Sequence, residues 1–122
     1  MKKLSDAELE IIRVLWAHKK PMTSNQILSE MSDKRSWKLA SLMTVLARMA
    51  EKEAVCCDRS TRTNYYTALV TEEQYKLMEG ESFLVRLYDK SAKNLIASLY
   101  QGQKMSKESI KELREYLDSL EE

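Results

Sequence analysis

Three polar side chains share one face of a helix that the sequence predicts over residues 37–53: Ser41, Thr44 and Arg48. Their i, i+3, i+7 spacing places them on one helical ridge, with the small residues Ala40 and Ala47 beside it. Hydroxyl and guanidinium groups hydrogen-bond base edges and phosphates, and small neighbours allow a helix to approach a large anion closely. The pattern therefore predicts a helix that enters the major groove of duplex DNA. A further cation, Lys38, stands at the start of the segment.

The opposite face of the same segment is apolar. Its residues recur at i, i+3, i+7 and i+10, with two more beside them: Leu39, Leu42, Leu46, Met49, Met43 and Ala50. Such a stripe is typical of a helix that covers a hydrophobic core, so we expect these side chains to be buried.

Two helices are predicted ahead of this segment, and each begins with a capping box and a hydrophobic staple. Ser5 with Glu8 opens the first, and Thr23 with Gln26 opens the second. The apolar residues expected to pack inward are Leu9, Ile12, Leu15 and Trp16 in the first helix and Ile27, Leu28 and Met31 in the second. The polar residues 32–36 then form a turn. Two helices and a short turn before an amphipathic third helix is the order of a helix-turn-helix.

A β-hairpin is predicted next, because residues 54–57 and 63–70 are rich in β-branched, aromatic and cysteine side chains. Between them lies a polar tip, residues 58–62, which contains Arg59 and Arg62. A hairpin that follows a recognition helix is a wing, and its arginines can reach phosphates or the minor groove. The alternative is a solvated loop that is basic by chance.

Beyond residue 70 the sequence predicts three amphipathic helices, whose starts are marked by Thr71, Ser91 and Ser106. Residues 71–122 are too few to bury three apolar faces alone, so we expect a second copy of the chain to cover them. The residues expected at that dimer interface are Phe83, Leu84, Leu87, Leu95, Leu99, Ile110, Leu113 and Leu117. The alternative is that these helices pack against the first part of the chain in a monomer.

Composition and charge agree with this organisation. The 122 residues include two glycines and one proline, too few turn formers for a sandwich or a barrel. Residues 1–70 carry a net charge of +4 and residues 71–122 a net charge of −3, which suggests that only the first part approaches DNA. Chance scatter of surface charge would give the same balance. We predict a mainly α fold with a small β-hairpin: an N-terminal winged helix-turn-helix domain, 1–70, and a C-terminal three-helix dimerisation domain, 71–122.

Catalytic and metal chemistry lack suitable residues in the sequence. Cys56 and Cys57 are adjacent and His18 is the one histidine, so neither a disulfide between the cysteines nor a zinc site is favoured. There is no glycine-rich phosphate loop and no HExxH motif, so we expect no enzyme activity, no cofactor and no metal. With no signal peptide and no run of eighteen apolar residues, we expect a cytoplasmic protein without membrane contact.

The combined pattern resembles the penicillinase-repressor family (BlaI/MecI/CopY type) of bacterial winged-helix regulators. The similar segments are Leu4 to Trp16, the recognition-helix residues Trp37, Ser41, Leu42, Thr44, Leu46 and Arg48, the wing end 65–70, the helix start 71–73, and the last helix from Met105 to Leu113. The resemblance covers nearly the whole chain. It implies base contacts from Ser41 and Thr44, base or backbone contacts from Arg48, and a dimer that represses transcription at a dyad-symmetric operator.

This chain also departs from the family. Ala40 and Met43 stand where basic residues are common, and Glu53 stands where a glycine is common. Fewer cations imply weaker phosphate attraction and a shallower salt dependence. In the β-lactam-responsive members an Asn-Phe bond in the penultimate helix is cleaved to release DNA. The aligned pair here is Ser98-Leu99, so a regulatory protease is not assigned.

Two other functions stay open at this point. In the first, the winged helix is a protein–protein interaction module, and the face with Ser41 and Thr44 meets a protein in place of DNA. In the second, the protein is a repressor that senses oxidants through Cys56 or Cys57.

Overall fold

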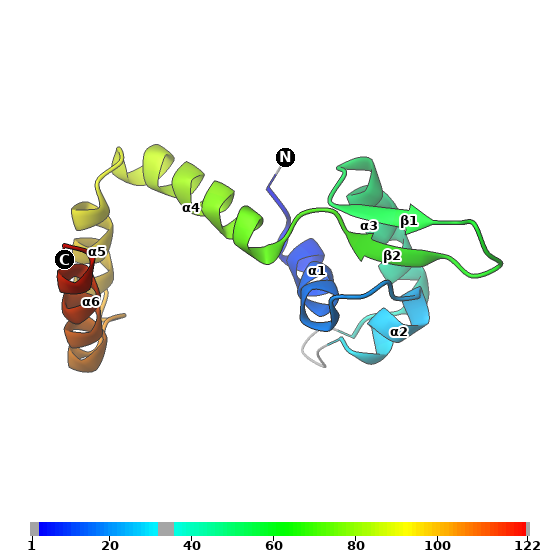
Figure 1. The fold of residues 1–122 in the computed structure, drawn as a ribbon, viewed down its shortest axis with the longest axis horizontal. Coiled ribbons are helices and arrows are strands. Elements are labelled where there is room, and N and C mark those ends of the chain that lie inside the picture. Colours follow the sequence, from blue (N-terminus) through cyan, green and yellow to red (C-terminus); the bar gives the residue numbers. More distant parts are fainter. Residues whose placement is uncertain (1–2, 32–35, 122) are drawn as a thin grey trace. The chain divides into compact units, whose positions relative to one another are not determined.

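The computed structural model describes residues 3–31 and 36–121 and has a mainly helical fold with one two-stranded hairpin, as predicted (Figure 1). The elements in chain order are α1 (Asp6–His18), α2 (Ser24–Ser29), α3 (Leu39–Glu51), β1 (Val55–Asp58), β2 (Tyr65–Ala68), α4 (Glu72–Tyr88), α5 (Ala92–Gln101) and α6 (Lys107–Leu120). The chain divides into two compact units between Met78 and Glu79, within α4. The expected turn at 32–36 lies mostly outside the described residues. Whether 1–70 and 71–122 fold as separate domains stays a prediction.

Local capping interactions begin the helices where the sequence predicts them. The Ser5 hydroxyl accepts from the Glu8 N–H at 3.2 Å, while Glu8 Oε1 accepts from the Ser5 N–H at 2.8 Å. The same reciprocal pair joins Thr23 to Gln26 before α2 and Thr71 to Gln74 before α4. The hydroxyls of Ser91 and Ser106 cap α5 and α6. Both predicted capping boxes are confirmed, and Thr71, which was predicted to mark a helix start, forms a third with Gln74.

The first unit has a well-defined hydrophobic core between its helices and hairpin. The buried apolar residues are Leu4, Ile11, Ile12, Leu15, Met22, Ile27, Leu42, Leu46, Met49, Ala54, Val55, Tyr66 and Tyr75. In α1 the expected core residues Leu9 and Trp16 are only half-buried, while Ile11 is fully buried. Because Ile11 is in the core, the face of α1 that packs inward is rotated slightly from the face that the spacing of its apolar residues predicts.

The predicted buried stripe of α3 is correct only in its centre. Leu42, Leu46 and Met49 are fully buried, but Leu39 and Met43 are exposed by 36% and 44%. Successive side chains of a helix are about 100° apart, so Met43 points roughly a quarter-turn away from the mean direction of the three buried side chains. The prediction that Leu39 and Met43 are buried is therefore wrong, and the exposed face of α3 is more apolar than expected.

The hairpin is antiparallel, and its register pairs Val55 with Ala68 and Cys57 with Tyr66. Cys56 is exposed and Cys57 is half-buried, as alternation along a strand predicts. Strand β2 is fixed to the helices through Met22, whose N–H and C=O bond the Tyr66 C=O and N–H at 3.0 and 2.8 Å. The hairpin is thereby held to the segment between α1 and α2.

The second unit has no comparable core. None of the described residues from 79 to 121 is buried. Helix α4 runs through Gly80 without interruption. Large apolar side chains are therefore accessible along all three of its helices.

Candidate DNA-binding surface

Helix α3 presents the predicted polar residues on its exposed side. It begins at Leu39, with Lys38 as an N-cap residue whose side chain makes no capping bond, and it ends at Glu51. Ser41, Thr44, Arg48 and Lys38 are all exposed. The structure thus places four of the six predicted DNA-binding residues at exposed positions on α3 or at its N-cap.

The Thr44 hydroxyl is oriented by its own helix. Thr44 Oγ1 donates to the Ala40 C=O at 3.0 Å, a bond from residue i to residue i−4. With its proton engaged there, the oxygen keeps its lone pairs for an incoming donor, and the methyl group stays available for apolar contact. Adenine and cytosine offer amino donors of this kind in the major groove.

An ion pair connects the end of α3 to the start of α1. Lys52, the C-cap residue of α3, donates to Glu8 Oε1 at 2.6 Å, and the Glu8 side chain is only 1% exposed. Burial raises the pKa of the Glu8 carboxyl, but the hydrogen bonds from Lys52 and Ser5 and the charge of Lys52 outweigh it and lower that pKa overall. Glu8 therefore both caps α1 and links the end of α3 to α1.

Sequence reasoning assigned Glu8 only its capping role. Its partner Lys52 lies 44 positions away, and no local pattern joins the two. The one available signal was a lysine in the last turn of the helix predicted over residues 37–53, a position that usually favours the helix dipole without further contact.

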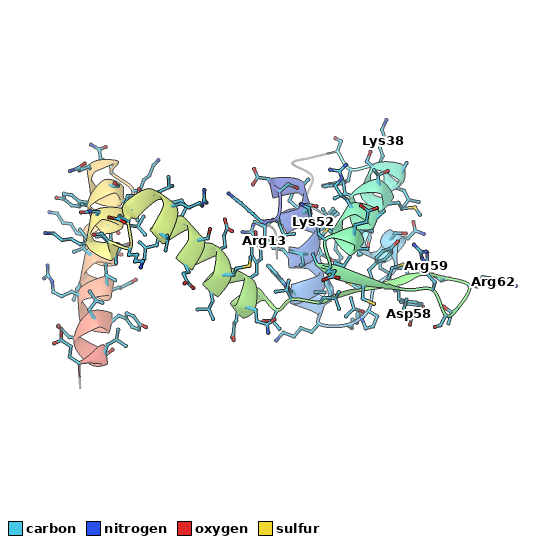
Figure 2. All side chains as sticks on the ribbon, turned by 90° about the horizontal axis from the view of Figure 1, so that it is seen from above. Arg13, Lys38, Lys52, Asp58, Arg59 and Arg62 are labelled. Atoms are coloured by element: carbon cyan, nitrogen blue, oxygen red, sulfur yellow. The ribbon has the colours of Figure 1, made fainter. Side chains whose placement is uncertain are left out.

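The tip of the hairpin carries the remaining two predicted residues. Arg59 and Arg62 are exposed there, on the loop between β1 and β2 (Figure 2). The loop is shaped without glycine, because Asp58 Oδ1 accepts from the Ser60 N–H at 2.9 Å and Thr61 Oγ1 donates to the Thr63 C=O at 2.7 Å. The bond from Ser60 also lowers the pKa of Asp58. Asp58 was not singled out from the sequence, although Asp before a Ser two residues on is a turn signal.

The first turn of α4 is packed against α1 within the first unit. Trp16 Nε1 donates to the Val70 C=O at 2.8 Å, and the Tyr75 hydroxyl accepts from the Leu4 N–H at 2.9 Å. The Trp16 and Tyr75 rings lie 6.0 Å apart. These contacts extend the first unit past the predicted boundary at residue 70.

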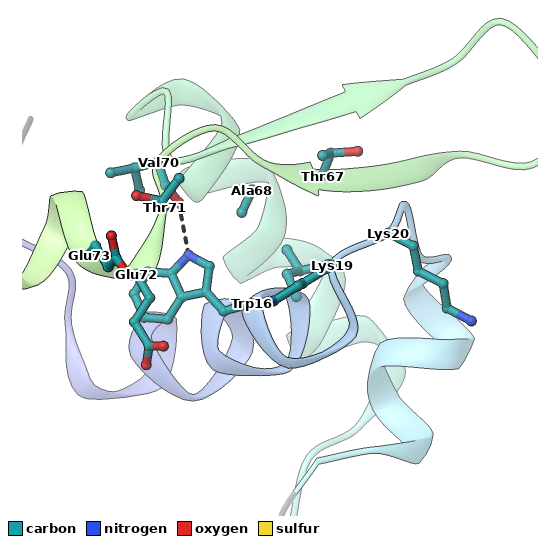
Figure 3. A pocket seen from close by; sticks show the side chains of 10 residues that line it. Trp16, Lys19, Lys20, Thr67, Ala68, Val70, Thr71, Glu72 and Glu73 are labelled. Atoms are coloured by element: carbon teal, nitrogen blue, oxygen red, sulfur yellow. Dashed lines mark hydrogen bonds between the residues drawn. The ribbon is translucent and has the colours of Figure 1, made fainter.

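A cavity of about 470 Å³ lies beside this junction (Figure 3). Residues of α1, the segment after it, β2 and the start of α4 line it, and its charged side chains are Lys19, Lys20, Glu72 and Glu73. No residue of α3 or of the hairpin tip contributes to its lining. With charges of both signs and none of the predicted DNA-binding residues in its lining, this cavity lies apart from the candidate surface.

The predicted dimer residues lie on all three helices of the second unit. Phe83, Leu84 and Leu87 belong to α4, Leu95 and Leu99 to α5, and Ile110, Leu113 and Leu117 to α6. Phe83, Leu87, Leu99 and Leu117 are exposed by 37%, 62%, 40% and 48%, and the other four are partly buried. Apolar surface is therefore exposed at the positions where the sequence predicts a dimer interface.

Metal-binding clusters and membrane-spanning helices are both absent from residues 3–31 and 36–121. No group of three or more His, Cys, Asp or Glu side chains in these ranges is placed to hold a metal ion. No helix in the same part of the chain is both long enough and apolar enough to cross a membrane.

Known proteins match this chain along most of its length. The sequence profile of the penicillinase repressor family matches residues 4–119. The penicillinase repressor of Bacillus licheniformis is 31% identical over 115 residues, which cover 94% of this chain and 89% of that protein. The chain belongs to the penicillinase-repressor family. The methicillin resistance regulatory protein MecI of Mammaliicoccus sciuri is 25% identical, over 94% of this chain and 93% of that protein.

Solved structures of BlaI share the fold of this family member. The solution structure of monomeric Bacillus licheniformis BlaI in complex with the blaP half-operator matches with a TM-score of 0.51 and 31% identity, over 61% of this chain and 89% of that one. The solution structure of the BlaI DNA-binding domain matches with a TM-score of 0.51 and 33% identity, over 62% of this chain and 94% of that one. The predicted winged-helix fold and the resemblance are both confirmed, and the family is one of transcriptional repressors, not of enzymes.

Proposed function

We propose that this penicillinase-repressor family member is a homodimeric transcriptional repressor that binds a dyad-symmetric operator through α3 and the hairpin wing. The observation that carries the proposal is the exposed hydroxyl and guanidinium face of α3, within a unit whose fold matches BlaI DNA-binding domains. The BlaI relative was solved as a monomer on a half-operator. A full operator would then accommodate two copies of the winged helix.

Each predicted residue has a role that suits its chemistry. Ser41 and Thr44 are short and read base edges, while Arg48 reaches a base or the backbone. Lys38, Arg59 and Arg62 neutralise phosphates beside the helix, and this attraction makes binding salt-dependent.

The dimer forms through the second unit. With no buried residue among those described from 79 to 121, its helices gain most of their apolar burial only from another copy. Two-fold pairing also suits a dyad operator, because the two recognition helices are then related by the symmetry of the DNA.

Charge reversal tests whether the ligand is DNA. We expect Arg48→Glu and Arg62→Glu in the full-length chain each to abolish retention of duplex DNA at near-physiological salt, because each change adds repulsion where attraction is needed. Arg114→Glu, a charge reversal on α6, is the matched control and should retain DNA. Unimpaired binding by both wing and helix variants would contradict the proposal and favour the protein-docking module.

A further inference from the structure

The recognition helix carries an exposed apolar strip beside its polar ridge. Met43 is 44% exposed, and Leu39, the first residue of α3, is 36% exposed. On a helix surface the neighbours of Met43 are the residues three and four positions away, which here are Leu39, Ala40, Leu46 and Ala47. Leu46 is buried in the core, while Met43 and its other three neighbours are exposed. Met43 is therefore surrounded on the helix surface by apolar side chains.

Met43 has the longest side chain in this strip. Ala40 and Ala47 end at their β-carbons, so they leave space around the Met43 thioether for a close partner. An unbranched thioether adapts its shape to an irregular apolar surface better than a branched side chain does. The strip is thus suited to contact a small apolar group that approaches α3.

The charges around the strip indicate which partner approaches. Lys38 lies at the start of α3 (Figure 2), and Arg48, which follows Ala47 in the sequence, is exposed. Thr44, adjacent to Met43 in sequence, offers a hydroxyl that accepts hydrogen bonds. A surface that combines cations, hydroxyls and an apolar strip is complementary to a DNA groove, where phosphates flank base edges.

The major-groove edges of the four base pairs present one apolar group, which is the C5-methyl of thymine. We propose that Met43 determines specificity by packing against a thymine methyl in each half-site of the operator, with Ala40 and Ala47 allowing the close approach. This inference deepens the proposed function and rests on it. It assigns to an apolar residue a part of the sequence readout that hydrogen bonding by Thr44 and Arg48 does not provide.

Uracil substitution tests the contact, because uracil differs from thymine only by the missing methyl. The probe is a duplex that the full-length protein retains from a random library, with its thymines replaced by uracil one at a time. For the wild-type protein, we expect one position in each half-site where uracil weakens binding about fourfold, which corresponds to the ~0.8 kcal/mol of one buried carbon. For Met43→Ala, the ratio of uracil to thymine dissociation constants at that position should fall to about one.

Leu77→Ala is the matched control, since Leu77 is 76% exposed on α4 and outside the recognition helix. It should keep the fourfold ratio even if overall affinity changes, because a ratio measured on one variant cancels effects on folding or assembly. Thermal unfolding of Met43→Ala verifies that the variant is folded.

Three results would overturn the inference. A wild-type protein that binds a specific duplex but does not distinguish uracil from thymine would refute it and leave the proposed function intact. A Met43→Ala variant that keeps the fourfold ratio would also refute the inference and leave the proposed function intact. If that variant also changes the sedimentation of the protein, the strip is a protein contact. A wild-type protein that retains no specific duplex would refute the proposed function as well.

Discussion

At the residue scale, the account depends on short polar side chains reading bases from α3. Thr44→Ala removes one hydroxyl and one methyl from an exposed helical position, so it should leave the fold intact. We expect it to weaken specific binding by about 1–3 kcal/mol, as for loss of a base contact. Competition of the operator against random duplex measures this. Equal losses on both DNAs would remove the base-reading role, and Thr44→Ser separates the hydroxyl from the methyl.

The backbone after α3 provides a second residue-scale prediction. Glu53 has φ of 62°, in the left-handed region that favours glycine. Glu53→Gly should raise the free energy of unfolding by about 0.5–1 kcal/mol, because it relieves this strain. Urea denaturation at fixed protein concentration measures the change. Glu51→Gly, at the last residue of α3, is the control and should lower the free energy of unfolding by less than about 1 kcal/mol.

At the scale of elements, the ion pair between α1 and α3 makes stability depend on pH. The folded protein lowers the pKa of Glu8 below its ordinary value of 4.5, so the ionised carboxylate stabilises the fold above that pH. This contribution is lost as pH falls from 4.5 through the folded pKa, because protonation weakens the bond to Lys52.

Glu8→Gln keeps a capping side chain but removes the charge. We expect it to lower the free energy of unfolding at pH 7 by about 2 kcal/mol, the size of a hydrogen bond to a charged group. The difference from wild type should shrink between pH 5 and pH 3. Denaturation midpoints across this range, with Glu112→Gln on α6 for comparison, provide the measurement. A difference that stays constant with pH would show that the charge of Glu8 does not contribute.

Local contacts within the helices and the hairpin could be predicted from the sequence, whereas contacts between distant elements could not. The helix starts and the hairpin could be predicted because Ser5, Thr23 and Thr71 act on backbone groups three residues away. The link from Glu8 to Lys52 and the anchoring of Tyr66 by Met22 could not, because they join positions separated by tens of residues. The prediction that Met43 is buried failed for a different reason. Helical periodicity gives the direction of the apolar face, but it does not show how much of that face the core covers.

At the scale of the whole molecule, the second unit should determine assembly. Leu117 is 48% exposed on α6, so Leu117→Asp places a charge on apolar surface without disrupting a protomer core. We expect this variant to sediment as a monomer and to lose most operator affinity, because a single winged helix contacts one half-site. Ser119→Asp, on the opposite side of the same helix, should remain dimeric. A Leu117→Asp variant that stays dimeric would place the interface elsewhere.

Selection from a random duplex library by the full-length protein, at near-physiological salt and followed by sequencing, tests the central claim most directly. The account predicts enrichment of a dyad motif whose half-sites lie about one helical turn apart, as two copies of α3 require. Retention of DNA without an enriched motif, or no retention at all, would contradict a sequence-specific dimeric repressor.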